Sequence, residues 1–226
     1  MSASTRRGLW LLPLAGALTA LPWFEFIHVP SGQQHVARDE ALRAVSLGDQ
    51  LATWAYIAGF LCLLFGLLAL HARVTFRRPD VVALAAVVLS VVAVTFLLSI
   101  QIGVVALARP TAAQVYLAGH EDVEQVVLQL SGGTFGSRIM AFLLATVLVA
   151  ALGAVAAAAA MWRSGSVPKA ASLLLPAGFL LTMTDFPVIA WAGSALLLVA
   201  GSWIAWAANR APASMADRAP AGLAEA

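Results

Sequence analysis

Two places in this sequence carry residues whose types and spacing could bind a metal ion. Glu25 and His28 are three residues apart, so a helix would place them on one face, and Glu-x-x-His is a ligand spacing of di-metal carboxylate bundles. His120 and Glu121 begin the densest acidic stretch of the chain. Because neutral imidazole beside carboxylate suits a transition metal such as zinc, these four residues form the candidate metal site. The alternative is that all four are simply hydrated at a membrane surface.

Polar side chains within or between the apolar segments form a second group. Gln101 is the one strongly polar side chain inside such a segment, and Ser90 lies eleven residues earlier on the same helical face. Intramembrane polar groups usually bond across helices, so a packing role is predicted, with a polar solute pathway as the alternative. Asp185 precedes Phe186 and Pro187, a pattern that predicts Asp185 as the cap of a helix that begins at residue 187.

Catalytic signatures are missing from the sequence. It contains no P-loop, no Gly-x-Ser-x-Gly, no Cys-x-x-Cys and no His-Glu-x-x-His. No acidic or basic residue falls at the middle of a predicted membrane segment, where an ion-coupled transporter would carry one. We therefore expect a protein that is not an enzyme and has no cofactor: a scaffold, a subunit or an accessory factor. The alternative is a transporter or sensor of a small solute or divalent metal, with an outward-facing site.

The composition places these residues in a membrane. The 226-residue chain is 62% hydrophobic and only 11% charged, and its mean hydropathy is +0.90. Soluble domains carry about 25% charged residues, so lipid has to cover the excess of apolar side chains. The net charge of +2 is too small to indicate nucleic-acid binding. The expected partners are the lipid bilayer of the cell (plasma) membrane and other membrane subunits or further copies of the chain.

The apolar runs predict an all-α, polytopic membrane bundle. A helix of about 20 apolar residues crosses a bilayer, and one long run divides at Asp185. The six predicted transmembrane helices are about 8–28, 51–70, 81–108, 138–162, 168–183 and 187–208. Residues 1–208 then form a single domain, and residues 209–226 a disordered cytoplasmic tail. Two short amphipathic helices, near 39–45 and 121–127, are expected to lie on the outer membrane surface.

The charge distribution predicts the orientation. Nine of the thirteen Lys and Arg residues fall in the N-terminal segment, residues 71–80, residues 162–169 and the C-terminal tail. Eight of the eleven acidic residues fall on the opposite side. Basic residues favour the cytoplasmic side, so both termini are expected in the cytoplasm, which agrees with an even number of helices.

Small residues mark predicted packing faces. Gly153 and Ala157 have small-xxx-small spacing, and Gly193, Gly201 and Ala205 form one stripe on the last helix. Such residues let helix backbones approach closely, either within the chain or between copies of it.

One stretch carries a resemblance to a known family. Residues 161–171 read MWRSGSVPKAA, and this resembles a turn in uncharacterised six-helix integral membrane proteins of actinobacteria, of the domain-of-unknown-function class. In those proteins a helix ends in Trp-Arg-Ser-Gly, a proline and a basic residue follow, and a short fifth helix begins. The layout over residues 8–208 is also similar. The resemblance implies a six-helix architecture and no activity.

Overall fold

The computed structural model describes residues 3–22, 36–75, 80–131, 137–184 and 186–210, and every regular element within them is helical. In chain order the elements are α1 (Ala3–Gly8), α2 (Leu11–Ala20), α3 (Val36–Ala44), α4 (Leu47–Val74), α5 (Val81–Ile100), η2 (Gln101–Ala108), α6 (Arg109–Leu117), η3 (Glu121–Val123), α7 (Glu124–Ser131), α8 (Ser137–Ser164), α9 (Lys169–Leu181) and α10 (Pro187–Arg210). The prediction of an all-α protein is confirmed.

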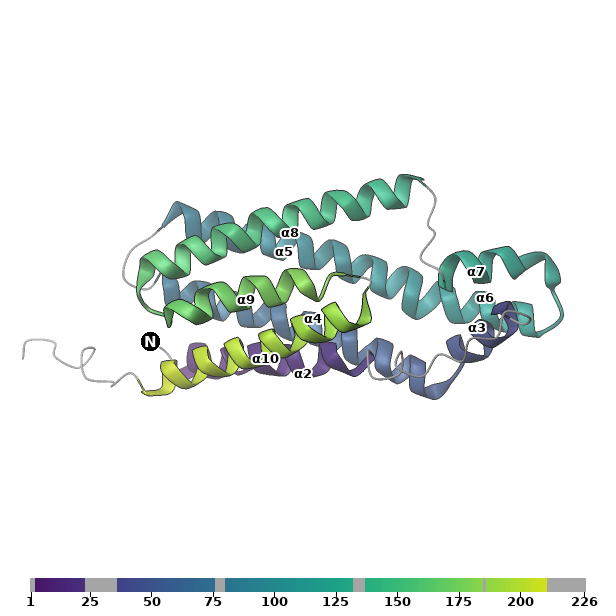
Figure 1. Cartoon of the computed structure of the whole chain (residues 1–226), viewed down its shortest axis with the longest axis horizontal. Coiled ribbons are helices and arrows are strands. Elements are labelled where there is room, and N and C mark those ends of the chain that lie inside the picture. The colour runs from purple at the N-terminus through teal and green to yellow at the C-terminus, as the bar shows by residue number, and fades with distance from the viewer. Residues whose placement is uncertain (1–2, 23–35, 76–79, 132–136, 185, 211–226) are drawn as a thin grey trace, which may run out of the picture.

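The long helices lie side by side in an elongated bundle (Figure 1). α5 packs on α8, α2 packs on both α4 and α10, and α9 packs on both α10 and α8. Within the described residues, four helices are long and apolar enough to cross a membrane: Leu47–Val74, Val81–Leu117, Ala141–Ser164 and Pro187–Arg210. These helices indicate a membrane protein in contact with a lipid bilayer.

The number of such helices corrects the sequence prediction, which gives six. The first and fifth predicted helices correspond to α2, with 10 residues, and α9, with 13. At a rise of 1.5 Å per residue they are about 15 and 20 Å long, against about 30 Å of hydrocarbon core. α9 is confined between Pro168 and Thr182, whose hydroxyl donates to the carbonyl of Phe179 at 2.7 Å where the helix ends. Residues 23–28, which the prediction included in the first helix, lie outside the described part of the chain.

Glycines set the close packing of the bundle. A Cβ atom added to Gly16 of α2 would lie 2.4 Å from the backbone nitrogen of Leu198 on α10. A Cβ on Gly201 of α10 would lie 2.6 Å from the nitrogen of Pro13, and one on Gly153 of α8 would lie 3.0 Å from Ser90 of α5. The packing faces predicted from small residues are therefore confirmed as contacts within one chain.

α8 presents an apolar stripe away from its neighbours. Leu144, Leu148, Leu152 and Val155 are 60%, 66%, 62% and 68% exposed. These residues recur at intervals of three or four and share one face of the helix. Such a face suits contact with lipid tails.

The third predicted helix is longer than expected, because it continues past Arg109 and Pro110. α5, η2 and α6 form one rod of 37 residues, Val81–Leu117. Within it, η2 is a π-helix, and the backbone N–H of Arg109 donates to the carbonyl of Val104, five residues back. A proline ring clashes with the carbonyl four residues before it in a regular α-helix. The wider turns of η2 just before Pro110 move that carbonyl, so the proline starts α6 instead of ending the rod.

The far end of this rod carries a helical headpiece, which we define as α3, α6 and α7. All three pack on one another at one end of the bundle (Figure 1). Their shared apolar centre contains Ala41, Ala44, Ala113 and Val127, each at most 1% exposed. The two amphipathic helices predicted from sequence thus exist as α3 and α7, but they bury their apolar faces against α6 and each other. The sequence predicted that these faces would rest on lipid.

Candidate functional site

The junction between the headpiece and the bundle is held by an arginine. Arg109, the first residue of α6, donates from Nη1 to Oδ2 of Asp49 at 3.0 Å. Its Nη2 lies 3.6 Å from Glu40 of α3, and Glu40 is also 3.7 Å from Arg43. Only 14% of the Arg109 side chain is exposed, and its Nε is buried with no hydrogen-bond partner among the described residues. One guanidinium therefore joins α3, α4 and α6.

Local sequence positions the carboxylate that Arg109 binds. Ser46 has an extended backbone and caps α4: its hydroxyl accepts a hydrogen bond from the backbone N–H of Asp49 at 3.2 Å. Asp49 then lies in the first turn of the helix, where the helix dipole favours a negative charge. Arg109 occupies the equivalent place at the start of α6, directly after the wide turns of η2. The capping of one helix and the proline-linked widening of another bring the two charges together.

A cavity of about 230 Å³ lies beside this ion pair, and we call it the headpiece cavity. Its walls come from the first two turns of α4 and from the end of η2 with α6. The lining residues are Asp49, Gln50, Thr53, Trp54, Val105, Ala106, Leu107, Pro110, Thr111 and Gln114. Drug-sized pockets measure about 300 Å³ or more, so this cavity suits a smaller solute or several ordered waters.

The hydrogen-bonding groups of the headpiece cavity are partly committed and partly free for a ligand. The Gln50 amide donates to the carbonyl of Val45 at 3.4 Å, and the Thr111 hydroxyl donates to that of Leu107 at 2.7 Å. Among the described residues, neither Thr53 nor Gln114 has a side-chain hydrogen bond. Hydroxyl and amide groups both donate and accept hydrogen bonds, so the walls can bind a polar solute that offers donors or one that offers acceptors.

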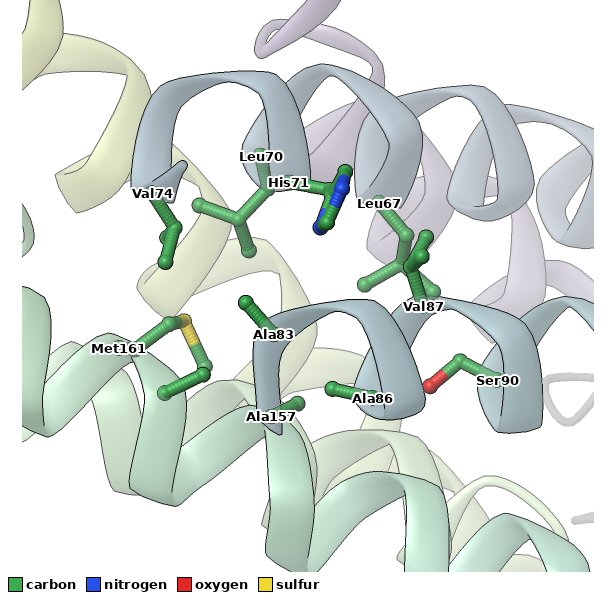
Figure 2. A pocket seen from close by; sticks show the side chains of 11 residues that line it. Leu67, Leu70, His71, Val74, Ala83, Ala86, Val87, Ser90, Ala157 and Met161 are labelled. Carbon is green, nitrogen blue, oxygen red and sulfur yellow. The ribbon is translucent and has the colours of Figure 1, made fainter. Parts of the chain in front are cut away.

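A second cavity lies at the opposite end of the bundle, between α4, α5 and α8, and we call it the basal cavity. It measures about 30 Å³, room for a water molecule. Figure 2 shows His71 entering it from α4 and Ser90 from α5, among apolar side chains such as Val87 and Met161. Nδ1 of His71 is buried and has no hydrogen-bond partner in the described part of the chain.

Apolar packing separates the two cavities. The headpiece cavity uses α4 as far as Trp54, and the basal cavity uses it from Leu67 onward. The intervening turns span about 20 Å at 1.5 Å per residue. They contribute Phe60 and Leu63, both 0% exposed, to the main apolar cluster, and α5 contributes Val94, also 0% exposed.

The structure places the residues of the predicted metal site only in part. Glu25 and His28 lie outside the described residues, as does the predicted helix cap Asp185. His120 is exposed, directly before η3, and Glu121 begins η3. No group of three or more potential metal ligands is found in the described part of the chain. The four-residue site remains a prediction.

Gln101 and Ser90 do not share a site. Ser90 is 3% exposed and lines the basal cavity, where it also contacts Gly153 of α8. Gln101 begins η2, is half-buried, and lines neither the headpiece cavity nor the basal cavity. None of the described residues forms a hydrogen bond with its side chain, so the predicted cross-helix bond is not seen there.

Sequence reasoning missed the headpiece cavity and Arg109. Arg109 and Asp49 are sixty residues apart in sequence. The charge distribution assigns both to the side opposite the basic segments, and it does not pair them with each other. One local signal could have found the arginine: Arg109-Pro110 directly follows a run of 28 residues without a charge. An arginine at such a boundary needs either water or a carboxylate partner.

Comparisons of the chain with protein-family models, with curated proteins and with solved structures find no significant match. The function is therefore argued from the geometry of the two cavities and the ion pairs.

Proposed function

We propose that this chain is a multi-pass protein of the bacterial plasma membrane that binds a small polar solute in the headpiece cavity. In this proposal it acts as a sensor or accessory subunit, and it is not an enzyme. The observation that carries the proposal is the headpiece cavity of about 230 Å³, lined by Asp49, Gln50, Thr53, Thr111 and Gln114 and braced by Arg109.

The orientation is part of the same proposal. The headpiece faces outward, and the end of the bundle with α1 and Arg210 faces the cytoplasm, because basic residues favour that side. The short helices α2 and α9 pack against α4, α8 and α10, which supports their being embedded with those helices. Exposed tryptophans at both ends, Trp54 and Trp191 on one side and Trp162 and Trp206 on the other, suit the two headgroup regions.

Sensing is favoured over transport by the apolar layer between the cavities. A transported polar solute would have to pass the turns that carry Phe60, Leu63 and Val94, all of which are 0% exposed. A solute in the headpiece cavity would instead contact η2 and α6, which continue α5 without a break. Occupation of the cavity could thereby be transmitted to the α5–α8 contact, as a sensor requires.

The test is a binding experiment with variants of one helix. Purified protein is heated with a panel of small cationic, neutral and anionic solutes, and the Tm is recorded. Thr111→Trp fills the headpiece cavity, whereas Val115→Trp places the same side chain on α6 at an exposed position that does not line it. We expect at least one solute to raise the Tm of wild type and Val115→Trp but not of Thr111→Trp. A panel with no stabilising solute, or equal shifts in all three proteins, would contradict the proposal and leave a purely structural scaffold.

A further inference from the structure

The wall of the headpiece cavity carries a negatively charged group, the carboxylate of Asp49. Among the described residues that line it, Asp49 alone carries a charge. A carboxylate accepts hydrogen bonds at about four lone-pair positions. Arg109 uses Oδ2 of Asp49. The Asp49 side chain remains 23% exposed, so the carboxylate keeps capacity for a second cation.

An indole lies in the same wall. Trp54 lines the headpiece cavity and is 49% exposed. The face of an indole attracts ammonium groups, most strongly where water is partly excluded. The chain already uses this interaction elsewhere, because Lys169 lies 5.5 Å from the ring centre of Trp162 and Arg210 lies 3.7 Å from that of Trp206.

The surroundings select against anions. The headpiece, η3 and the first turn of α4 hold five acidic and three basic residues whose side chains the structure describes: Asp39, Glu40, Asp49, Asp122 and Glu124, and Arg38, Arg43 and Arg109. Their net formal charge is −2. A field of this sign raises the local concentration of cations and repels anions. Among these described residues the most buried cation is Arg109, which already donates to Asp49 and forms an ion pair with Glu40.

We infer that the ligand of the headpiece cavity is a small organic ammonium ion, bound between the carboxylate of Asp49 and the indole of Trp54. The inference rests on the proposed function, because it names the ligand class for the same cavity. A free ammonium solute and the ammonium headgroup of a membrane lipid share this chemistry.

Two probes of equal shape test the charge. Choline and its uncharged carbon isostere, dimethylbutanol, are titrated into protein in nanodiscs of phosphatidylglycerol. We expect choline to bind about tenfold or more tightly than dimethylbutanol, as a contact with a carboxylate implies. Equal binding of the two probes would overturn the ammonium assignment while leaving solute binding intact. Binding of neither probe, with another solute of the Tm panel still active, would also overturn it, and failure of the whole panel would remove the proposed function as well.

Variants then locate the contact. Asp49→Asn should weaken choline binding about tenfold, and Trp54→Leu about threefold. Asp39→Asn removes the same charge from an exposed position on α3 that does not line the cavity, so it should weaken choline binding much less than Asp49→Asn does, by its share of the overall field alone. Should Asp49→Asn fail to fold, Trp54→Leu and the isostere comparison still decide. An equal loss in Asp39→Asn and Asp49→Asn would mean that only the overall field acts, which contradicts a built site.

A change of nanodisc lipid identifies the source of the ammonium group. If lipid headgroups occupy the cavity, phosphatidylcholine discs will abolish the response to added choline. If the ligand is a free solute, the response will persist in those discs. Either result agrees with an ammonium site, provided that the choline preference is seen in phosphatidylglycerol.

Discussion

Gly16 illustrates how single residues determine the helix spacing of this protein. Its missing side chain lets α2 approach the backbone of α10, and the nearby hydroxyl of Thr19 lies 3.1 Å from the hydroxyl of Ser194. Bonds of this kind between membrane helices contribute only about 0.6 kcal/mol on average. The close approach of the two helices, more than the hydrogen bond, therefore holds this pair together.

The close approach at Gly16 can be tested by substituting alanine there and at a second helical glycine, Gly103, that has open space around it. Gly16→Ala places a Cβ 2.4 Å from a backbone nitrogen, so the two helices must separate, and we expect a loss of about 1–3 kcal/mol in the free energy of unfolding. Gly103→Ala meets no atom within 4 Å and should be neutral or slightly stabilising. Denaturation of both variants in the same detergent measures the difference. Similar stabilities would show that the α2–α10 contact is looser than described.

Arg109 shows a second effect at the residue scale. A largely buried guanidinium costs desolvation, and its two carboxylates, 23% and 28% exposed, offset part of that cost. The Nε that lacks a partner among the described residues adds to the cost. The Arg109 guanidinium therefore contributes little net free energy to folding. Its main effect is to fix the place where α3, α4 and α6 meet. This fixed meeting point shapes one wall of the headpiece cavity.

At the scale of helices, the headpiece depends on a small apolar centre, which a paired substitution can test. Val127 of α7 is 1% exposed and Val126 beside it is 44% exposed. Val127→Asp buries a carboxylate against Ala41 and Ala113, so α3 and α7 should detach from α6. Limited proteolysis should then cut the Val127→Asp protein in residues 36–47 and leave the long helices intact.

The control for this experiment is Val126→Asp, which should remain as resistant to the protease as wild type. Equal cleavage of the two variants would mean that α7 does not pack as described. Loss of the whole bundle in Val127→Asp would mean that the headpiece is not a separate layer of the structure.

The rod of α5, η2 and α6 continues through a residue that would ordinarily end a helix. Arg109-Pro110 predicts a helix end, because proline lacks the N–H that would donate the next backbone hydrogen bond of the helix. The chain instead widens into π-type turns, and Arg109 donates five residues back. π-Helical turns often occur at functional sites. Here the end of η2 supplies Val105, Ala106 and Leu107 to the wall of the headpiece cavity.

At the scale of the whole molecule, the proposed orientation is open to direct labelling. In a Cys62→Ala background, Gln125→Cys marks the exposed face of α7 and Asn209→Cys marks the exposed end of α10. A maleimide that cannot cross membranes should label Gln125→Cys in intact cells, and Asn209→Cys only after permeabilisation. The positive-inside bias is the physical reason. The reverse pattern would place the headpiece and its cavity in the cytoplasm.

Much of the bundle was predictable because its signals are local. The predicted helices 138–162 and 187–208 correspond to Ser137–Ser164 and Pro187–Arg210 in the structure. Each is a run of apolar residues whose length alone demands a helix in lipid. The same reasoning counted six membrane-spanning helices, whereas the described residues contain four. The bounds of α9, Lys169–Leu181, lie within two residues of the predicted 168–183, but its 13 residues are too few to cross a bilayer.

The sequence by itself determined that the chain is helical, that it has the long apolar helices of a membrane protein and that small residues such as Gly153 and Gly201 mark packing faces. These properties follow from composition and from spacing within one helix. Only the tertiary structure decided that α3 and α7 pack on α6 and that Arg109 meets both Asp49 and Glu40. The headpiece cavity follows from those contacts. Its walls come from segments about fifty residues apart, and no local pattern encodes which of several charged and amphipathic segments will meet.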